Sequence, residues 1–195
     1  MSQYFNFNDL SYLSNLEKLT TFKYFGNYTT EPTYDAGKTD ITGIGNLIYL
    51  KNLELTNLKN VWNISDLERC TNLEALTIYN TNISNISCIK NMPNLRKLIM
   101  YSNAIKDIYP ILSCKKLEEV DFRYNLLTDV GYHNSGSGSM MYDTLDVFYS
   151  LNQHLEAEET LDGVSGSLKK VLLKGNSFSD TDLIKSVEWD TALDI

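Results

Sequence analysis

The sequence has few of the side chains that usually build catalytic or metal centres. It contains two histidines, His133 and His154, and it has neither the C-x-x-C nor the H-E-x-x-H spacing of common metal sites. The acidic residues between positions 156 and 162 fit a solvated turn better than a calcium site or a pair of general acids. We therefore expect no metal ion, no cofactor and no enzymatic activity.

Long apolar runs are also missing. No stretch of about 18 apolar residues occurs, and the first nine residues have neither a basic start nor an uninterrupted apolar run. The sequence therefore predicts no membrane span and no signal peptide. A chain that is native as written begins in the cytoplasm, whereas one that has lost an export signal is extracellular or attached to the cell surface.

Basic residues are in deficit. The chain has 17 lysines and arginines against 25 aspartates and glutamates, which gives a formal net charge of -8 and a pI near 4.7. Nucleic acids and anionic membranes select for clustered lysine and arginine, so we expect neither as a partner. A partner with a basic surface is the weaker, positive inference from the same charge.

What the sequence does contain is an apolar pattern, L-x-x-L-x-L-x-x-N-x-L, that returns every 22 or 23 residues between positions 41 and 130. Its copies are Leu50, Leu53 and Leu55; Leu73, Leu76, Ile78, Asn82 and Ile83; Leu95, Leu98, Met100, Asn103 and Ile105; and Leu117, Val120, Phe122, Asn125 and Leu127. A second apolar series with steps of three lies between the copies, at Ile64 and Leu67, Ile86 and Ile89, and Ile108 and Ile111.

The alternation within L-x-L predicts a short strand, and the second series predicts a return along the other side of each coil. One coil cannot bury its leucines alone, so stacked coils form a solenoid with a continuous core. Amphipathic helices are the alternative, but Pro93, Pro110 and the asparagine-rich turn over 79–85 interrupt the spacing that helices need. We therefore predict an α/β fold, a curved solenoid with about seven short parallel strands on its concave face and short helical or extended segments on its convex face.

The coil length and the I-x-x-I-x-x-I/L segment resemble the short leucine-rich repeats of bacterial internalins and of a eukaryotic phosphatase regulator. The resemblance covers most of the chain. It implies a concave face that binds another protein, but it does not identify that protein, because such coils serve many partners. A structural or scaffold role in a larger or engineered protein is the alternative to this binding module.

We expect a single domain over residues 1–195. Its parts are an N-terminal cap with a partial repeat (1–21), a loop insertion (22–40), regular repeats (41–130), a degenerate repeat with a Ser-Gly-rich loop (131–167), and a last repeat with a C-terminal cap (168–195). Leu19 is predicted to hold the position of Leu53, which leaves 12 residues more than one coil to loop out. Phe5 and Phe7 are expected to cover the open end of the first coil.

The degenerate repeat leaves two interpretations open. Residues 144–151 align with residues 119–126 and so predict a sixth strand, whereas the apolar spacing over 141–155 also permits an amphipathic helix. The Ser-Gly run over 135–139 is either native or an engineered linker. Beyond it, residues 168–178 predict a seventh strand, and residues 179–189 predict a capping helix.

The repeat positions assign roles to cysteine and asparagine. Cys70 and Cys114 share a position two coils apart, so their Cα atoms should lie at least ~10 Å apart, beyond the roughly 7 Å limit of a disulfide. We expect these thiols and Cys88 to be reduced. The side-chain amides of Asn103 and Asn125, and of Asn176 in the last repeat, are predicted to bond backbone groups where each strand ends.

The register also separates inward from outward residues of each strand. The predicted inward residues are Leu53, Leu55, Leu76, Ile78, Leu98, Met100, Val120, Phe122, Val171 and Leu173. The predicted outward residues are Glu54, Thr56, Thr77, Tyr79, Ile99, Tyr101, Asp121, Arg123, Asp146, Phe148, Leu172 and Lys174. Aromatic residues collect among the latter, so we predict a partner-binding surface made of Tyr79, Ile99, Tyr101, Asp121, Arg123, Tyr124, Asp146, Phe148 and Tyr149. The alternative is that the aromatic rows only stabilise the sheet.

Overall fold

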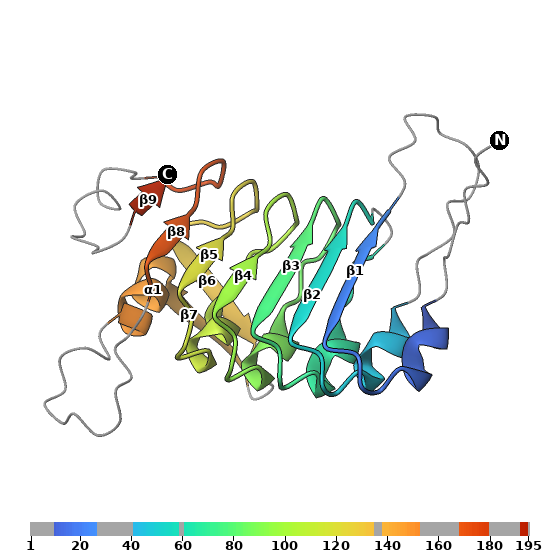
Figure 1. The fold of residues 1–195 in the computed structure, drawn as a ribbon. Coiled ribbons are helices and arrows are strands. Elements are labelled where there is room, and N and C mark those ends of the chain that lie inside the picture. Colours follow the sequence, from blue (N-terminus) through green and yellow to red (C-terminus); the bar gives the residue numbers. More distant parts are fainter. Residues whose placement is uncertain are drawn as a thin grey trace, which may run out of the picture.

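The computed structural model describes residues 10–26, 41–58, 61–134, 138–152, 168–179 and 192–194. Within these ranges, seven parallel strands form one sheet in the order β1-β2-β3-β4-β5-β8-β9 (Figure 1). The strands are β1 Thr21–Phe25, β2 Asn52–Thr56, β3 Ala75–Tyr79, β4 Lys97–Ile99, β5 Glu119–Asp121, β8 Lys170–Leu172 and β9 Ala192–Asp194. The predicted parallel solenoid sheet is confirmed.

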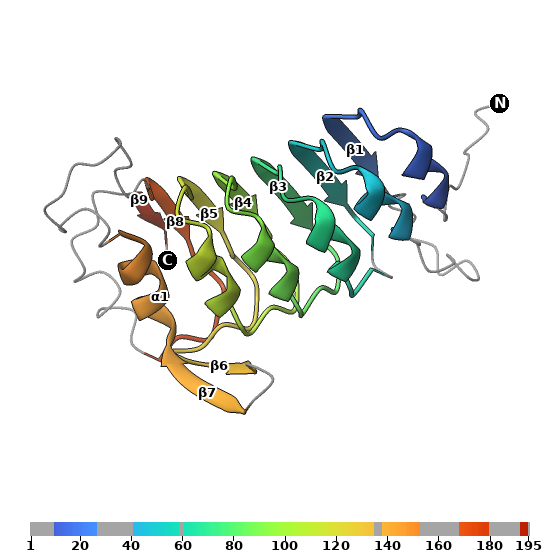
Figure 2. The same cartoon turned by 90° about the horizontal axis from the view of Figure 1, so that it is seen from below.

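Short 3₁₀ helices form a second layer beneath the sheet (Figure 2). They are η1 Ser11–Asn15, η2 Thr42–Asn46, η3 Ser65–Arg69, η4 Ser87–Asn91 and η5 Tyr109–Ser113. No helix of the described ranges is long and apolar enough to cross a membrane.

The apolar steps of three explain why these segments are 3₁₀ helices. Around η3, the residues Ile64, Leu67, Cys70 and Leu73 are three apart, and each N–H donates to the carbonyl of the one before, at 3.0, 2.9 and 3.2 Å. A 3₁₀ helix has three residues per turn, so these four side chains share one face. All four are fully buried.

The predicted inward residues of the strands form the side of the core that is next to the sheet. All ten are at most 2% exposed. They stack coil on coil, so each leucine or isoleucine of an inner coil contributes about 1.5–3 kcal/mol of burial. The predicted register from β2 to β8 is confirmed.

Asparagines at one repeat position tie each coil to the coil before it. Nδ2 of Asn125 donates to the carbonyl of Met100 in the preceding coil at 2.8 Å and to that of Phe122 in its own coil at 3.0 Å. Asn103 and Asn176 make the equivalent pairs of bonds. The predicted structural role of these three amides is confirmed.

Two predicted positions are shifted. In the coil of β3 the asparagine position holds Thr81, which is buried, and not Asn82, which is exposed. In the first coil, Phe22 pairs with Leu53, so the prediction that Leu19 holds this position was wrong. The insertion between β1 and β2 is therefore three residues shorter than predicted. The roles predicted for Phe5 and Phe7, for most of the 22–40 loop and for the helix near residue 185 lie outside the described residues.

The prediction of a strand over 144–151 was wrong, and the alternative is confirmed. This segment is the α-helix α1, Thr144–Asn152. β5 pairs directly with β8, with Val120 opposite Val171, so the sheet has no place for another strand between them. Helix α1 instead packs against η5, and its Phe148 is fully buried.

An antiparallel hairpin precedes α1, and the sequence pattern did not predict it. It consists of β6 Val130–Asn134 and β7 Ser139–Asp143, which flank the Ser-Gly run. Figure 2 shows that the hairpin lies outside the parallel sheet.

The three cysteines are buried and free, as predicted. Burial raises the pKa of the Cys70 thiol to about 11, and it raises the pKa values of Cys88 and Cys114 to about 12. The thiols therefore stay protonated near neutral pH and act as small core residues.

Candidate functional site

The outward face of the parallel sheet, here called the sheet face, is the surface predicted to be concave. Equivalent residues of neighbouring coils are in register, so their side chains form rows across the strands. Backbone hydrogen bonds continue this register past the strand ends, from Gly26 N–H to Thr56 O at 2.7 Å through Tyr124 N–H to Lys174 O at 2.8 Å. The row at these ends, here called the end row, is Phe25, Thr56, Tyr79, Tyr101, Arg123 and Lys174.

Three planar groups of the end row lie against one another. The rings of Tyr79 and Tyr101 stack with their centroids 4.4 Å apart and an angle of 12° between their planes. The guanidinium carbon of Arg123 lies 5.7 Å from the centroid of the Tyr101 ring. Stacked rings and a cation over a ring are both attractive arrangements, so three successive coils present one ordered surface.

The carboxylate of Asp121 holds Arg123 in this position. Nε and Nη2 of Arg123 donate to Oδ1 and Oδ2 of Asp121 at 3.0 and 2.7 Å. The backbone N–H of Arg123 donates to Oδ1 as well, at 3.1 Å. Such a two-pronged pair fixes the guanidinium plane. Asp121 itself is only 3% exposed, so the prediction that it faces solvent was wrong, and it acts on the surface through Arg123.

The surroundings of Tyr101 keep its hydroxyl protonated. Burial is the main cause that raises the pKa of Tyr101, and the neighbouring Tyr79 raises it further. The phenol is therefore a neutral hydrogen-bond donor and acceptor throughout the physiological range.

Lys174 ends the row beside Arg123. Its side chain is exposed, and its ammonium group makes no ion pair with any described residue. The other charged side chains of the sheet face differ in this respect.

Two ionic rows lie at the opposite ends of the strands and alternate in sign. The first is Lys51, Glu74, Arg96, Glu118 and Lys169, and the second is Lys97, Glu119 and Lys170. Their ion pairs measure 2.5–3.1 Å. Between the ionic rows and the end row, Lys23 pairs with Glu54 at 2.8 Å. Exposed pairs of this kind contribute little to stability individually, and these rows hold six cations against four anions.

Two other predicted site residues border the end row. Ile99 is half-buried, between Thr77 and Asp121 in the middle of the sheet face. Tyr124 follows Arg123 in a left-handed conformation, with φ of 54°, and is 53% exposed.

The remaining predicted site residues do not lie on the sheet face. Asp146, Phe148 and Tyr149 belong to α1, which is no part of the sheet, so their predicted placement on the sheet face was wrong. The placement failed because strand and helix share the apolar spacing of this segment. Thr56 and Leu172 are also buried, contrary to their predicted exposure.

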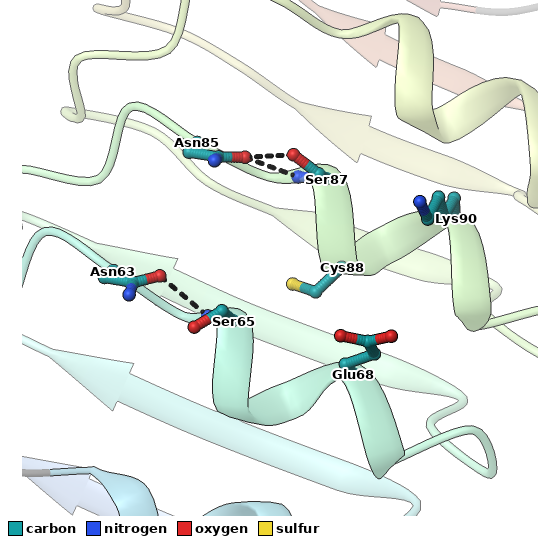
Figure 3. Close-up of a pocket in the computed structure, with 7 residues that line it drawn as sticks. All are labelled: Asn63, Ser65, Glu68, Asn85, Ser87, Cys88 and Lys90. Carbon is teal, nitrogen blue, oxygen red and sulfur yellow. Dashed lines mark hydrogen bonds between the residues drawn. The ribbon is translucent and has the colours of Figure 1, made fainter. Parts of the chain in front are cut away.

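A small cavity of about 100 Å³ lies on the other side of the coils, between η3 and η4 (Figure 3). It is lined by Asn63, Ser65, Glu68, Asn85, Ser87, Cys88 and Lys90. Oδ1 of Asn63 and of Asn85 each accepts the N–H two residues ahead at 2.9 Å, so these amides shape the turns. Burial raises the pKa of the Cys88 thiol to about 12, so this thiol stays protonated and is a poor nucleophile.

The same turn position in the next coil holds Asp107, which anchors the hairpin. Its Oδ1 accepts the Tyr109 N–H at 2.9 Å and the Tyr142 hydroxyl at 3.0 Å, while Oδ2 lies 2.8 Å from Nδ1 of His133. The Tyr142 oxygen in turn accepts the Ile108 N–H at 2.8 Å. This cluster was missed from the sequence. Its signal is the exchange of asparagine for aspartate at one repeat position. Among the described residues, no group of three or more His, Cys, Asp and Glu could hold a metal ion.

Comparison with known proteins identifies the fold. The family model for leucine-rich repeats in two copies matches residues 93–134. No curated protein sequence matches the chain. Two internalins of Listeria monocytogenes have similar structures. Internalin F gives a TM-score of 0.64 at 19% identity over 95% of this chain, and internalin C2 gives 0.65 at 23% identity over 95%. The predicted leucine-rich repeats with internalin-like coils are confirmed.

The chain spans 50% of the internalin F chain and 66% of the internalin C2 chain. A plant peptide hormone receptor, RGFR1, solved in complex with RGF2, is also similar, with a TM-score of 0.50 at 20% identity over 87% of this chain and 27% of the receptor. At these identities the likeness establishes the fold alone.

Proposed function

We propose that this leucine-rich-repeat solenoid is a non-enzymatic module that binds another protein through the sheet face, with Tyr79, Tyr101 and Arg123 at the centre of contact. The observation that carries the proposal is the ordered stack of these three side chains on an open face. Tyrosine and arginine dominate binding hot spots, because they bury a large area and keep a polar group available.

Preorganisation adds to this argument. A partner that orders flexible side chains loses about 0.5–1.5 kcal/mol for each one. The stack on Tyr101 and the ion pair with Asp121 already hold the Arg123 guanidinium in place, so binding would avoid most of that entropy cost. Sheet stabilisation alone would not require this ion pair.

The neighbours support a polypeptide partner in general terms. RGFR1 is a peptide hormone receptor solved in complex with RGF2, and PEPR1, another similar structure, was solved with AtPEP1. Both have TM-scores of 0.50 with this chain. A polypeptide partner therefore has precedent within the fold.

A displayed library of random peptides tests the proposal. Peptides of about ten residues reach ~33 Å when extended, enough to cross the described strands. We expect selection on the wild-type protein to enrich peptides whose affinity falls about 30-fold for each hot-spot residue lost, as measured with Tyr79→Ala and Tyr101→Ala. Tyr132→Ala, at a 62% exposed tyrosine of the hairpin, is the matched control and should bind as wild type does.

The proposal fails if the enriched peptides bind both tyrosine variants as tightly as wild type, or if only the hairpin variant loses them. Circular dichroism and thermal melts of each variant establish that the fold is kept. The proposal would also be contradicted if the wild-type protein enriched no peptide more strongly than an unrelated protein of the same net charge.

A further inference from the structure

The charge of the sheet face points to the chemistry of its partner, if the proposed function holds. We propose that the partner is an acidic polypeptide segment, which places an apolar side chain on Tyr79 and Tyr101 and a carboxylate between Arg123 and Lys174. This sign is opposite to the one that the net charge of the chain suggests.

The described side chains of the end row, the ionic rows and the Lys23–Glu54 row include eight cations and five anions, counting Asp121. These described side chains are therefore net positive, although the whole chain carries -8. Three segments outside the described ranges, 27–40, 153–167 and 180–191, hold 11 of the 25 acidic residues and only two lysines. The rest of the chain is therefore close to neutral, with 14 acidic and 15 basic residues.

The cations differ in how far they are neutralised. Each lysine of the ionic rows lies in an ion pair, although Lys97 and Lys170 share the Glu119 carboxylate, and the Asp121 carboxylate pairs with Arg123. Lys174 has no such partner among the described residues. Lys174 therefore offers a positive charge at this end of the row, while Arg123 supplies directed donors beside it.

The spacing of the row constrains the partner segment. Neighbouring strands are about 4.8 Å apart, so Lys174 lies two strands, or ~10 Å, from Tyr101. An extended peptide advances ~3.3 Å per residue. The carboxylate should therefore follow or precede the apolar residue by about three positions.

The peptides selected on the wild-type protein test this inference. We expect them to carry Asp or Glu about three residues from an aromatic or aliphatic residue. Each is compared with a copy in which Asn or Gln replaces the acid, and the copy should bind about fivefold more weakly at low salt. Lys174→Glu should abolish or reverse this preference and leave the dependence on Tyr101 intact. Lys90→Glu, at an exposed lysine of η4, is the matched control and should change neither.

The outcomes separate the two proposals. Peptides that need Tyr79 and Tyr101 but contain neutral or basic residues would overturn this inference and leave the proposed function standing. Peptides indifferent to both tyrosines would overturn both. Competition with the peptides by a random single-stranded oligonucleotide would indicate a nucleic acid as the partner. Self-association of the protein that Lys174→Glu abolishes would indicate a second copy of this chain. Either result would overturn the inference.

Discussion

A β-carbon on Gly175 would lie 2.4 Å from Cδ1 of Tyr124. The two residues follow the end row in adjacent coils, and both have positive φ, 54° at Tyr124 and 78° at Gly175. Asn57, Asn80 and Ser102 hold the same position with φ between 53° and 59°. Each coil from β2 to β8 thus turns away from the sheet through one left-handed residue, and Gly175 leaves room for the aromatic ring.

Gly175→Ala is expected to destabilise the protein by about 1–3 kcal/mol, because it adds a steric clash to an unfavourable φ. Chemical denaturation measures the change. The double variant Tyr124→Ala/Gly175→Ala should lose less than the sum of the two single variants, since the clash is then absent. Additive losses would show that the ring and the glycine are not coupled.

Tyr142→Phe is expected to cost about 1–3 kcal/mol, because it leaves the N–H of Ile108 without its acceptor and removes a donor from Asp107. Hydrogen exchange over 130–143 should accelerate as the hairpin loosens. Tyr132→Phe, at an exposed hydroxyl of the same hairpin, is the control and should stay within about 0.5 kcal/mol of wild type. Equal stability of the two variants would mean that the Asp107 cluster does not anchor the hairpin.

Asn125→Ala is expected to destabilise by about 1–3 kcal/mol, since it leaves the buried Ile105 N–H without its acceptor. It also removes one of the two amide donors from each of the Met100 and Phe122 carbonyls, which keep only their bonds from Asn103 and Asn176. Asn82→Ala alters an exposed asparagine one position beyond Thr81 and should cost less than Asn125→Ala, because water can replace the lost bonds of an exposed amide. Urea unfolding measures the stability of both variants. A larger loss from Asn82→Ala would mean that Asn82, and not the buried asparagine position, has the structural role.

Acid should weaken the ionic rows. The hydrogen bond from Lys97 is the main cause that lowers the pKa of Glu119, and Lys170 lowers it further against the opposing effect of burial. A carboxylate with a lowered folded-state pKa adds stability above its unfolded pKa of about 4.3, and that stability is lost as the pH falls through the folded value.

The free energy of unfolding should therefore decline below about pH 5, and Glu119→Gln should flatten this decline. Glu17→Gln, at an exposed glutamate with no ion pair among the described residues, should leave the slope unchanged. Denaturant titrations at several pH values measure both slopes. The same slope in Glu119→Gln and wild type would contradict the assignment.

Much of the fold and part of the site follow from spacing in the sequence. A repeat of 22 or 23 residues places equivalent residues on neighbouring strands, so the inward leucines, the ladder of Asn103, Asn125 and Asn176, and the contact of Tyr79 with Tyr101 were predictable. Each of these features depends only on the period of the pattern and on the strand spacing, and both are local quantities repeated along the chain.

Long-range packing determined the rest. Residues 144–152 have apolar spacing compatible with a strand and with a helix, and the pairing of β5 with β8 leaves only the helical position, which buries Phe148. Asp107 meets His133 and Tyr142 across 26 and 35 residues because the hairpin folds back onto η5. The burial of Asp121 under Arg123 likewise depends on side-chain geometry, since alternation assigns a face of the sheet but not the depth to which a side chain is covered.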